Sequence, residues 1–157
     1  MPALLQPQKD SAQLFSLGIH VQKASATLPA TTTQNIFTIT GGRIWVVALV
    51  GEVTTVIQNQ ANNMKVTSVP TTGTGVDVAS NLNVANFEAG AILVCEGDGT
   101  ALIGTSAGAG FAPALNALPF ILPIGTVRIE TSATNTGATK WDLFYFPFDD
   151  GATVASA

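Results

Sequence analysis

The side chains that could carry acid–base or metal chemistry are few and lie far apart in the sequence. The chain has 1 histidine, His20, whose immediate neighbours are Ile19 and Val21. A catalytic base or a metal ligand works only where several such groups converge on one point, and no cysteine or second histidine lies near His20 in the sequence. We therefore interpret His20 as a polar residue at the start of a strand.

Ser106 is the serine whose surroundings most resemble a catalytic or phosphate-binding loop, because it lies in the glycine-rich sequence GTSAGAG at 104–110. A serine nucleophile stands on a strained turn between a strand and a helix, and a phosphate-binding loop ends in Gly-Lys-Ser/Thr before a helix. The segment lacks that ending, and no helical pattern follows it. We interpret it as a loop and predict neither a nucleophile nor a nucleotide site.

Two pairs of carboxylates lie close together in the sequence. Glu96 and Asp98 flank Gly97, and Asp149 and Asp150 are adjacent. Calcium loops alternate oxygen ligands and end in a glutamate, a pattern that neither pair has, whereas an aspartate in a turn accepts hydrogen bonds from nearby backbone. The first pair is interpreted as part of a turn and the second as part of a solvated tail.

The single cysteine, Cys95, lies in the apolar sequence AILVC. One cysteine cannot form a disulfide within the chain, and its neighbours indicate a small buried apolar side chain. Together with the residues above, it leads us to predict no cofactor, no metal and no enzymatic activity.

Charge is scarce in this sequence. Charged residues make up 10% of the 157 residues, against about 25% in a typical soluble domain. Apolar residues make up 46%, and 20 threonines, which favour strands, replace much of the missing charge. No uninterrupted apolar run approaches the ~20 residues of a transmembrane helix, so we expect no membrane partner. A surface with so few charges is typical of a protein that its partners cover.

The sign and distribution of charge disfavour nucleic acid as a partner. The net charge is −4, whereas binding to nucleic acid depends on basic patches that neutralise phosphates. The 6 cationic residues are scattered singly along the chain: Lys9, Lys23, Arg43, Lys65, Arg128 and Lys140.

Short alternating segments separated by turn residues dominate the chain. They predict about eight to ten short antiparallel strands, with turns every 8–12 residues, as in a β-sandwich or barrel. The Gly-Gly pair at 41–42 predicts a hairpin between the strands at 34–40 and 43–50. The fold class is therefore all-β, with three parts: an extended N-terminal arm at 1–19, one β-sandwich domain at 20–148, and a C-terminal tail at 149–157.

Aromatic and apolar side chains indicate where partners bind. Trp45 and Trp141 are assigned to the core, but the sequence FYFPF at 144–148 is too apolar for a strand with one solvated face. Aromatic residues are enriched where interfaces exclude water, and the arm carries apolar residues of its own. The candidate contact residues are Leu14, Phe15, Leu17, Phe144, Phe146 and Phe148.

The segments 21–58, 131–141 and 149–154 resemble small structural proteins of tailed-bacteriophage head gene clusters, most closely the capsid decoration, or cement, proteins. These include the sequences TITGGRIWVVALV, TSATNTGATKW and DDGATV. The resemblance runs through roughly the central two-thirds of the chain. It implies a jelly-roll-like sandwich, made in the host cytoplasm, that binds the outer surface of the capsid in the virion.

The same resemblance implies the partners. They are the major capsid protein, whose subunits the chain would bridge, and further copies of the chain in a trimer or a dimer. Two other functions remain open on the sequence. One is a host-receptor or carbohydrate-binding sandwich of the virion, with Trp141 or Tyr145 stacking on sugars; the other is a head–tail or tail component.

Overall fold

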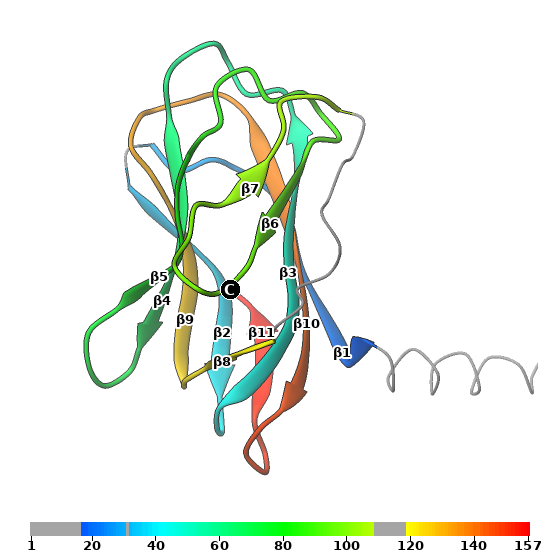
Figure 1. Cartoon of the computed structure of the whole chain (residues 1–157), viewed down its shortest axis with the longest axis vertical. Helices are drawn as coiled ribbons and strands as arrows, with labels where there is room; N and C mark the ends of the chain where they lie inside the picture. The colour runs from blue at the N-terminus through cyan, green and yellow to red at the C-terminus, as the bar shows by residue number, and fades with distance from the viewer. Residues whose placement is uncertain (1–16, 31, 109–118) are drawn as a thin grey trace, which may run out of the picture.

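The computed structural model describes residues 17–30, 32–108 and 119–157, and their regular structure is almost entirely β (Figure 1). Short alternating segments rich in Val, Ile and Thr favour extended backbone, because branched and aromatic side chains pack well on a pleated surface. The strands are β1 (Ile19–Thr27), β2 (Thr33–Thr40), β3 (Ile44–Thr55), β4 (Asn63–Pro70), β5 (Val76–Asn83), β6 (Ile92–Cys95), β7 (Ile103–Gly104), β8 (Phe120–Leu122), β9 (Gly125–Thr131), β10 (Ala138–Pro147) and β11 (Thr153–Ser156).

The strands form two antiparallel sheets that face each other (Figure 1). The first sheet has the order β1-β10-β3-β6-β7, with β8 also paired to β3, and the second has the order β11-β2-β9-β4-β5. The strand pairs are nested along the chain, so that each pair lies within the previous one in the sequence: β1 with β10, β2 with β9, β3 with β6, and β4 with β5. This is the connectivity of a jelly roll, and the predicted all-β sandwich is confirmed.

The core lies between the two sheets and follows the alternation of the strands. On β9, Val127 and Ile129 are fully buried while Arg128 and Glu130 face outward. On β10, Trp141, Leu143 and Tyr145 are buried, which confirms the assignment of Trp141 to the core. Because side chains alternate between the faces of a strand, the residues between these positions form the outer surfaces of the sandwich.

Trp141 explains a glycine inside the long strand β3. Gly51 pairs with Trp141 across the first sheet. A Cβ atom on Gly51 would lie 2.9 Å from the indole ring, closer than side-chain atoms normally approach. The Trp141 ring therefore covers the backbone of β3, and its Nε1 donates a hydrogen bond to the Thr139 hydroxyl at 3.2 Å.

The predicted hairpin at 41–42 is wrong. The strands on either side of these glycines, β2 and β3, belong to different sheets, so the Gly-Gly turn carries the chain from one sheet to the other. Gly41 has a φ of +77°, and a Cβ there would lie 2.2 Å from the carbonyl oxygen of Gly151. The glycines serve a close backbone approach to residues 149–152 rather than a hairpin.

The predicted C-terminal tail is partly a strand. Thr153–Ser156 form β11, which pairs with β2 at the edge of the second sheet. Ala152 is buried and the Val154 side chain packs against the core, while the Val154 amide donates to the Tyr145 hydroxyl oxygen at 3.2 Å. At the other end, β1 already begins at Ile19, within the predicted arm, and residues 1–16 lie outside the described residues.

Candidate interaction surface

His20 lies near the start of β1, as predicted, and has partners on the neighbouring strand. Its Nε2 is 2.7 Å from Oδ1 of Asp142, and the Gln22 side-chain amide donates to the same oxygen at 2.8 Å. The imidazole stacks on the Phe144 ring, with centroids 4.6 Å apart and planes 12° apart. These contacts tie β1 to β10 on the outer surface of the first sheet.

Ser106 lies far from this histidine. The residues from Gly104 to Gly108 have the spacing G-x-S-x-G, but the strand before them, β7, is a two-residue strand at the edge of the first sheet. His20 is on β1, at the opposite edge of the same sheet, which at ~4.8 Å per strand spacing is roughly 19 Å away. The geometry therefore does not join Ser106 to the His20–Asp142 pair.

The other candidates for chemistry have structural partners. Asp98 accepts hydrogen bonds from the Thr100 hydroxyl and amide, and these bonds lower the pKa of Asp98, as expected of a turn. Cys95 is fully buried, and desolvation raises the pKa of its thiol to about 12. Within residues 17–30, 32–108 and 119–157, no three His, Cys, Asp or Glu side chains are grouped in a way that could hold a metal ion.

Apolar side chains gather instead on the outer surface of the first sheet. We call this surface the aromatic face; its residues are Trp45, Ile121, Phe144, Phe146 and Phe148. Phe146 pairs with Trp45, and Trp45 pairs with Ile121, so the three side chains form a row across β10, β3 and β8. Trp45 is 45% exposed and Ile121 is 49% exposed.

The assignment of Trp45 to the core is wrong, and its neighbours give the reason. Ile44 and Val46 are fully buried, and alternation on β3 then turns Trp45 to the opposite side. The segment IWVVALV is apolar at every position, so the pattern alone does not show which set faces inward. A bulge between Phe144 and Tyr145 adjusts the register so that Phe146 stands beside Trp45.

Arg43 and Phe148 lie at one end of the aromatic face. The Arg43 guanidinium lies 4.7 Å from the centre of the Phe148 ring, and it donates two hydrogen bonds of 2.8 Å to the carboxylate of Asp149. These bonds, with one from the Arg43 amide, lower the pKa of Asp149 to about 2. Asp149 is therefore more than a solvated residue of the tail, because its carboxylate binds the Arg43 guanidinium that lies over Phe148.

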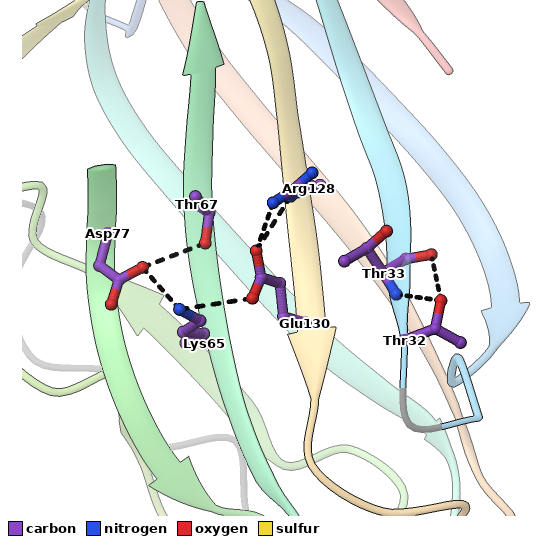
Figure 2. Close-up of polar contacts among 7 residues, drawn as sticks. All are labelled: Thr32, Thr33, Lys65, Thr67, Asp77, Arg128 and Glu130. Carbon is purple, nitrogen blue, oxygen red and sulfur yellow. Dashed lines mark hydrogen bonds and ion pairs between the residues drawn. The ribbon is translucent and has the colours of Figure 1, made fainter. Parts of the chain in front are cut away.

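The outer surface of the second sheet is different in kind (Figure 2). We call it the ionic face; its residues are Lys65, Thr67, Asp77, Arg128 and Glu130. Lys65 bridges Asp77 at 2.9 Å and Glu130 at 3.3 Å, and Arg128 contacts Glu130 at 2.8 Å. Desolvation opposes ionisation of Glu130, but hydrogen bonds from Arg128 and Lys65 outweigh it and lower the pKa.

A shallow depression of about 200 Å³ lies beside the ionic face. Lys65 and Glu130, the charged residues in its lining, are already bound to each other. The remaining lining residues are Asn63, Asn81, Thr131 and Ser132. These observations do not identify a ligand for it.

The structure places the predicted contact residues in two groups. Phe144 and Phe146 are half-buried and Phe148 is 49% exposed, all on the aromatic face. Leu17 is half-buried just before β1, and Leu14 and Phe15 lie outside the described residues. Sequence reasoning missed Trp45 and Ile121, which the register of β3 with β8 brings together.

Two proposed sugar-stacking residues are in the core. Trp141 is 1% exposed and Tyr145 is 3% exposed, so neither ring face is open to a glycan. In the part of the chain that the structure describes, no helix is long and apolar enough to cross a membrane.

Comparison with known proteins leaves the family open. No protein-family model matches the chain, and no curated protein matches it. Among solved structures, the chain is similar to one described as "Structure of infectious bursal disease virus Gx strain", with 15% identity and a TM-score of 0.23, over 87% of this chain and 33% of that chain. A similarity at this level carries no functional argument, and the comparisons do not support the closer resemblance to tailed-phage decoration proteins.

Proposed function

We propose that the chain is a non-enzymatic structural protein of a virion that decorates the outer surface of a phage capsid and bridges subunits of the major capsid protein. The observation that carries this proposal is the aromatic face. The outward side of an antiparallel sheet is normally polar, yet here Phe146, Trp45 and Ile121 form an uninterrupted apolar row. Such a surface is expected to be covered when the protein performs its function.

The composition of the aromatic face suits a contact with another protein. Trp and other aromatic residues are enriched at the centres of interfaces, where water is excluded. Around this centre lie polar groups that already have partners, including Asp142 with His20 and Arg43 with Asp149. A partner can therefore cover the row without burying an unpaired charge, which would be costly.

Decoration stabilises a shell through many copies of one contact. Each copy that binds the assembled shell but not its separated subunits shifts the equilibrium toward the shell. Repetition over the capsid and association of the copies, as the resemblance implies for a trimer, would multiply modest affinities. The scarcity of charge, 10% of the residues, fits a protein covered by neighbours on several sides.

The test is co-sedimentation of the purified chain with shells of the major capsid protein from the same virion, prepared without the chain. We expect the chain to pellet with the shells up to a fixed stoichiometry, and to raise the temperature at which the shells come apart. The chain alone should remain in the supernatant. If it neither pellets nor adds density to the outer surface of the shells in electron micrographs, capsid decoration is wrong; binding to tails or to host glycans instead would favour one of the other virion functions.

A further inference from the structure

The chain contains two Asp-Gly sequences, Asp98-Gly99 and Asp150-Gly151. An aspartate before a glycine is prone to form a succinimide, because a glycine has no side chain to hinder the attack of its amide nitrogen on the preceding side-chain carboxyl. Both aspartates are exposed, and the two glycines have nearly the same φ, +81° at Gly99 and +82° at Gly151. The two sites are therefore closely matched in sequence, exposure and glycine conformation, and they differ in their hydrogen bonds.

At the first site, both reacting groups are held. Oδ1 of Asp98 accepts hydrogen bonds from the Thr100 amide at 2.9 Å and from the Thr100 hydroxyl at 2.5 Å. The Gly99 amide donates to the carbonyl oxygen of Val78 at 3.2 Å, which ties the loop after β6 to β5. The nitrogen that would attack is thus engaged, and the carboxyl that it would attack is directed toward Thr100.

At the second site, neither group is held. The Ala152 amide donates to the Asp149 carbonyl oxygen at 3.1 Å, which closes a turn over residues 149–152. Asp150 and Gly151 occupy the centre of this turn, where the closing hydrogen bond does not use their amides. Among the described residues, none hydrogen-bonds to the Asp150 side chain and none accepts from the Gly151 amide. A Cβ on Gly151 would meet nothing within 4 Å, so the turn has room to rearrange.

We propose that Asp150 is a site of spontaneous isoaspartate formation and that Asp98 is protected from it. The Gly151 amide nitrogen attacks Cγ of Asp150 and forms a C–N bond, while the hydroxyl of the neutral carboxyl leaves with the amide proton as water. The product is a five-membered succinimide. One water molecule then opens the ring: breakage of the bond to the main-chain carbonyl gives isoaspartate, and breakage of the bond to the side-chain carbonyl restores aspartate. The water that is lost is regained, and no electrons are transferred.

Isoaspartate would alter the turn at the end of the aromatic face. Its main chain passes through the side-chain methylene of residue 150 and gains one atom, while the former main-chain carboxyl becomes a free carboxylate of the same charge. The added atom lies within the turn that the Ala152–Asp149 hydrogen bond closes, next to the Asp149 carboxylate that binds Arg43. The inference concerns the isolated chain and does not depend on the proposed function.

The test follows the full-length chain in water enriched in oxygen-18 at neutral pH, folded in one sample and unfolded in concentrated guanidinium chloride in another. Hydrolysis of each succinimide incorporates one oxygen-18 atom, so the label counts passages through the ring whichever product forms. The chain is then digested in ordinary water, and electron-transfer fragmentation of the peptides distinguishes isoaspartate from aspartate at each position. Asp150→Glu is the matched variant, because it retains the charge but needs a six-membered ring, which closes more slowly.

In the folded chain, we expect label and isoaspartate to accumulate severalfold faster at Asp150 than at Asp98. In the unfolded chain, where the hydrogen bonds of Asp98 and Gly99 are lost, the two sites should react at similar rates. Asp150→Glu should lose the label at that position and leave the slow reaction at Asp98 unchanged.

Three results would overturn the inference. One is a rate at Asp98 in the folded chain that equals or exceeds the rate at Asp150. Another is label at neither site of the folded chain when both sites react in the unfolded chain, because the turn over residues 149–152 would then protect Asp150 as well. The third is a difference between the sites that persists in the unfolded chain, which would assign it to the neighbouring sequence and not to the hydrogen bonds.

Discussion

The outer surfaces of the two sheets differ in whether their side chains find partners within the chain. On the ionic face, Lys65, Arg128 and Glu130 satisfy one another's charges across β4 and β9. On the aromatic face, Trp45 and Ile121 remain about half exposed, and the cross-strand neighbours of Trp45 are the apolar residues Phe146 and Ile121. The charged side chains of the first surface are paired within a single chain, whereas the second surface leaves large apolar side chains exposed to solvent.

The low total charge of this protein bears on its function because of where the few charged residues lie. Four of the charged residues form one network on the outer surface of the second sheet. The strands of the first sheet carry four as well, Lys23, Glu52, Lys140 and Asp142, but none of them stands in the row Phe146–Trp45–Ile121. We expect the ionic face to remain in contact with water and the aromatic face to lie against a partner.

The largest expected effect contrasts the two tryptophans. Trp141 is fully buried and covers Gly51, so Trp141→Ala should lower the free energy of unfolding by about 3–5 kcal/mol, the usual cost of removing a large core side chain. Trp45→Ala should lower it by only about 1 kcal/mol, because Trp45 is 45% exposed and only part of its surface is removed from water. Urea unfolding of both variants measures the difference. Similar losses in the two would mean that Trp45 is structural and that the aromatic face is not a free surface.

A smaller effect is expected from the centre of the ionic face. Glu130→Ala leaves Lys65 and Arg128 without their shared partner and should cost about 1 kcal/mol, near the upper end for partly exposed pairs. Asp77→Ala should cost less, because Glu130 still holds Lys65. Unfolding at low and high salt checks the origin, since added salt screens such pairs. A larger loss for Asp77→Ala than for Glu130→Ala would contradict this order.

The smallest effect concerns pH at the end of the aromatic face. Arg43 lowers the pKa of Asp149 to about 2 in the folded chain, while an unfolded aspartate has a pKa of about 3.9. The contribution of this pair to stability is therefore full above about pH 4 and is lost as the pH falls toward 2. Asp149→Asn should melt at a slightly lower temperature than the unaltered chain at pH 6, and the difference should vanish near pH 2. A difference that does not change with pH would rule out the charge as its cause.

The sequence predicted local structure well and long-range pairing poorly. The alternation of GTVRIET and KWDLFYF is typical of strands, and it matches the alternating burial of β9 and β10. The Gly-Gly turn at 41–42 shows the limit, because a turn signal does not say whether the strands around it pair with each other. Here β2 pairs with β9 and β11, which lie far along the chain, and not with β3, which follows the turn.

The candidate surface was found only in part for the same reason. The FYFPF segment is apolar on both faces of one strand, so the sequence alone predicted Phe144, Phe146 and Phe148 as contact residues. Trp45 and Ile121 join them through strand register, and Asp149 reaches Arg43 across 106 residues. None of these contacts leaves a local pattern in the sequence.

The most direct test of the central claim compares the two faces in one capsid-binding assay. Trp45→Ser/Phe146→Ser alters the aromatic face, Lys65→Ser/Glu130→Ser alters the ionic face, and each folded variant is titrated onto shells that lack the chain. We expect the first variant to bind at least about tenfold more weakly than the unaltered chain, a change of about 1.4 kcal/mol, and the second to bind as the unaltered chain does. Unchanged binding by the first variant, or a loss confined to the second, would contradict the account.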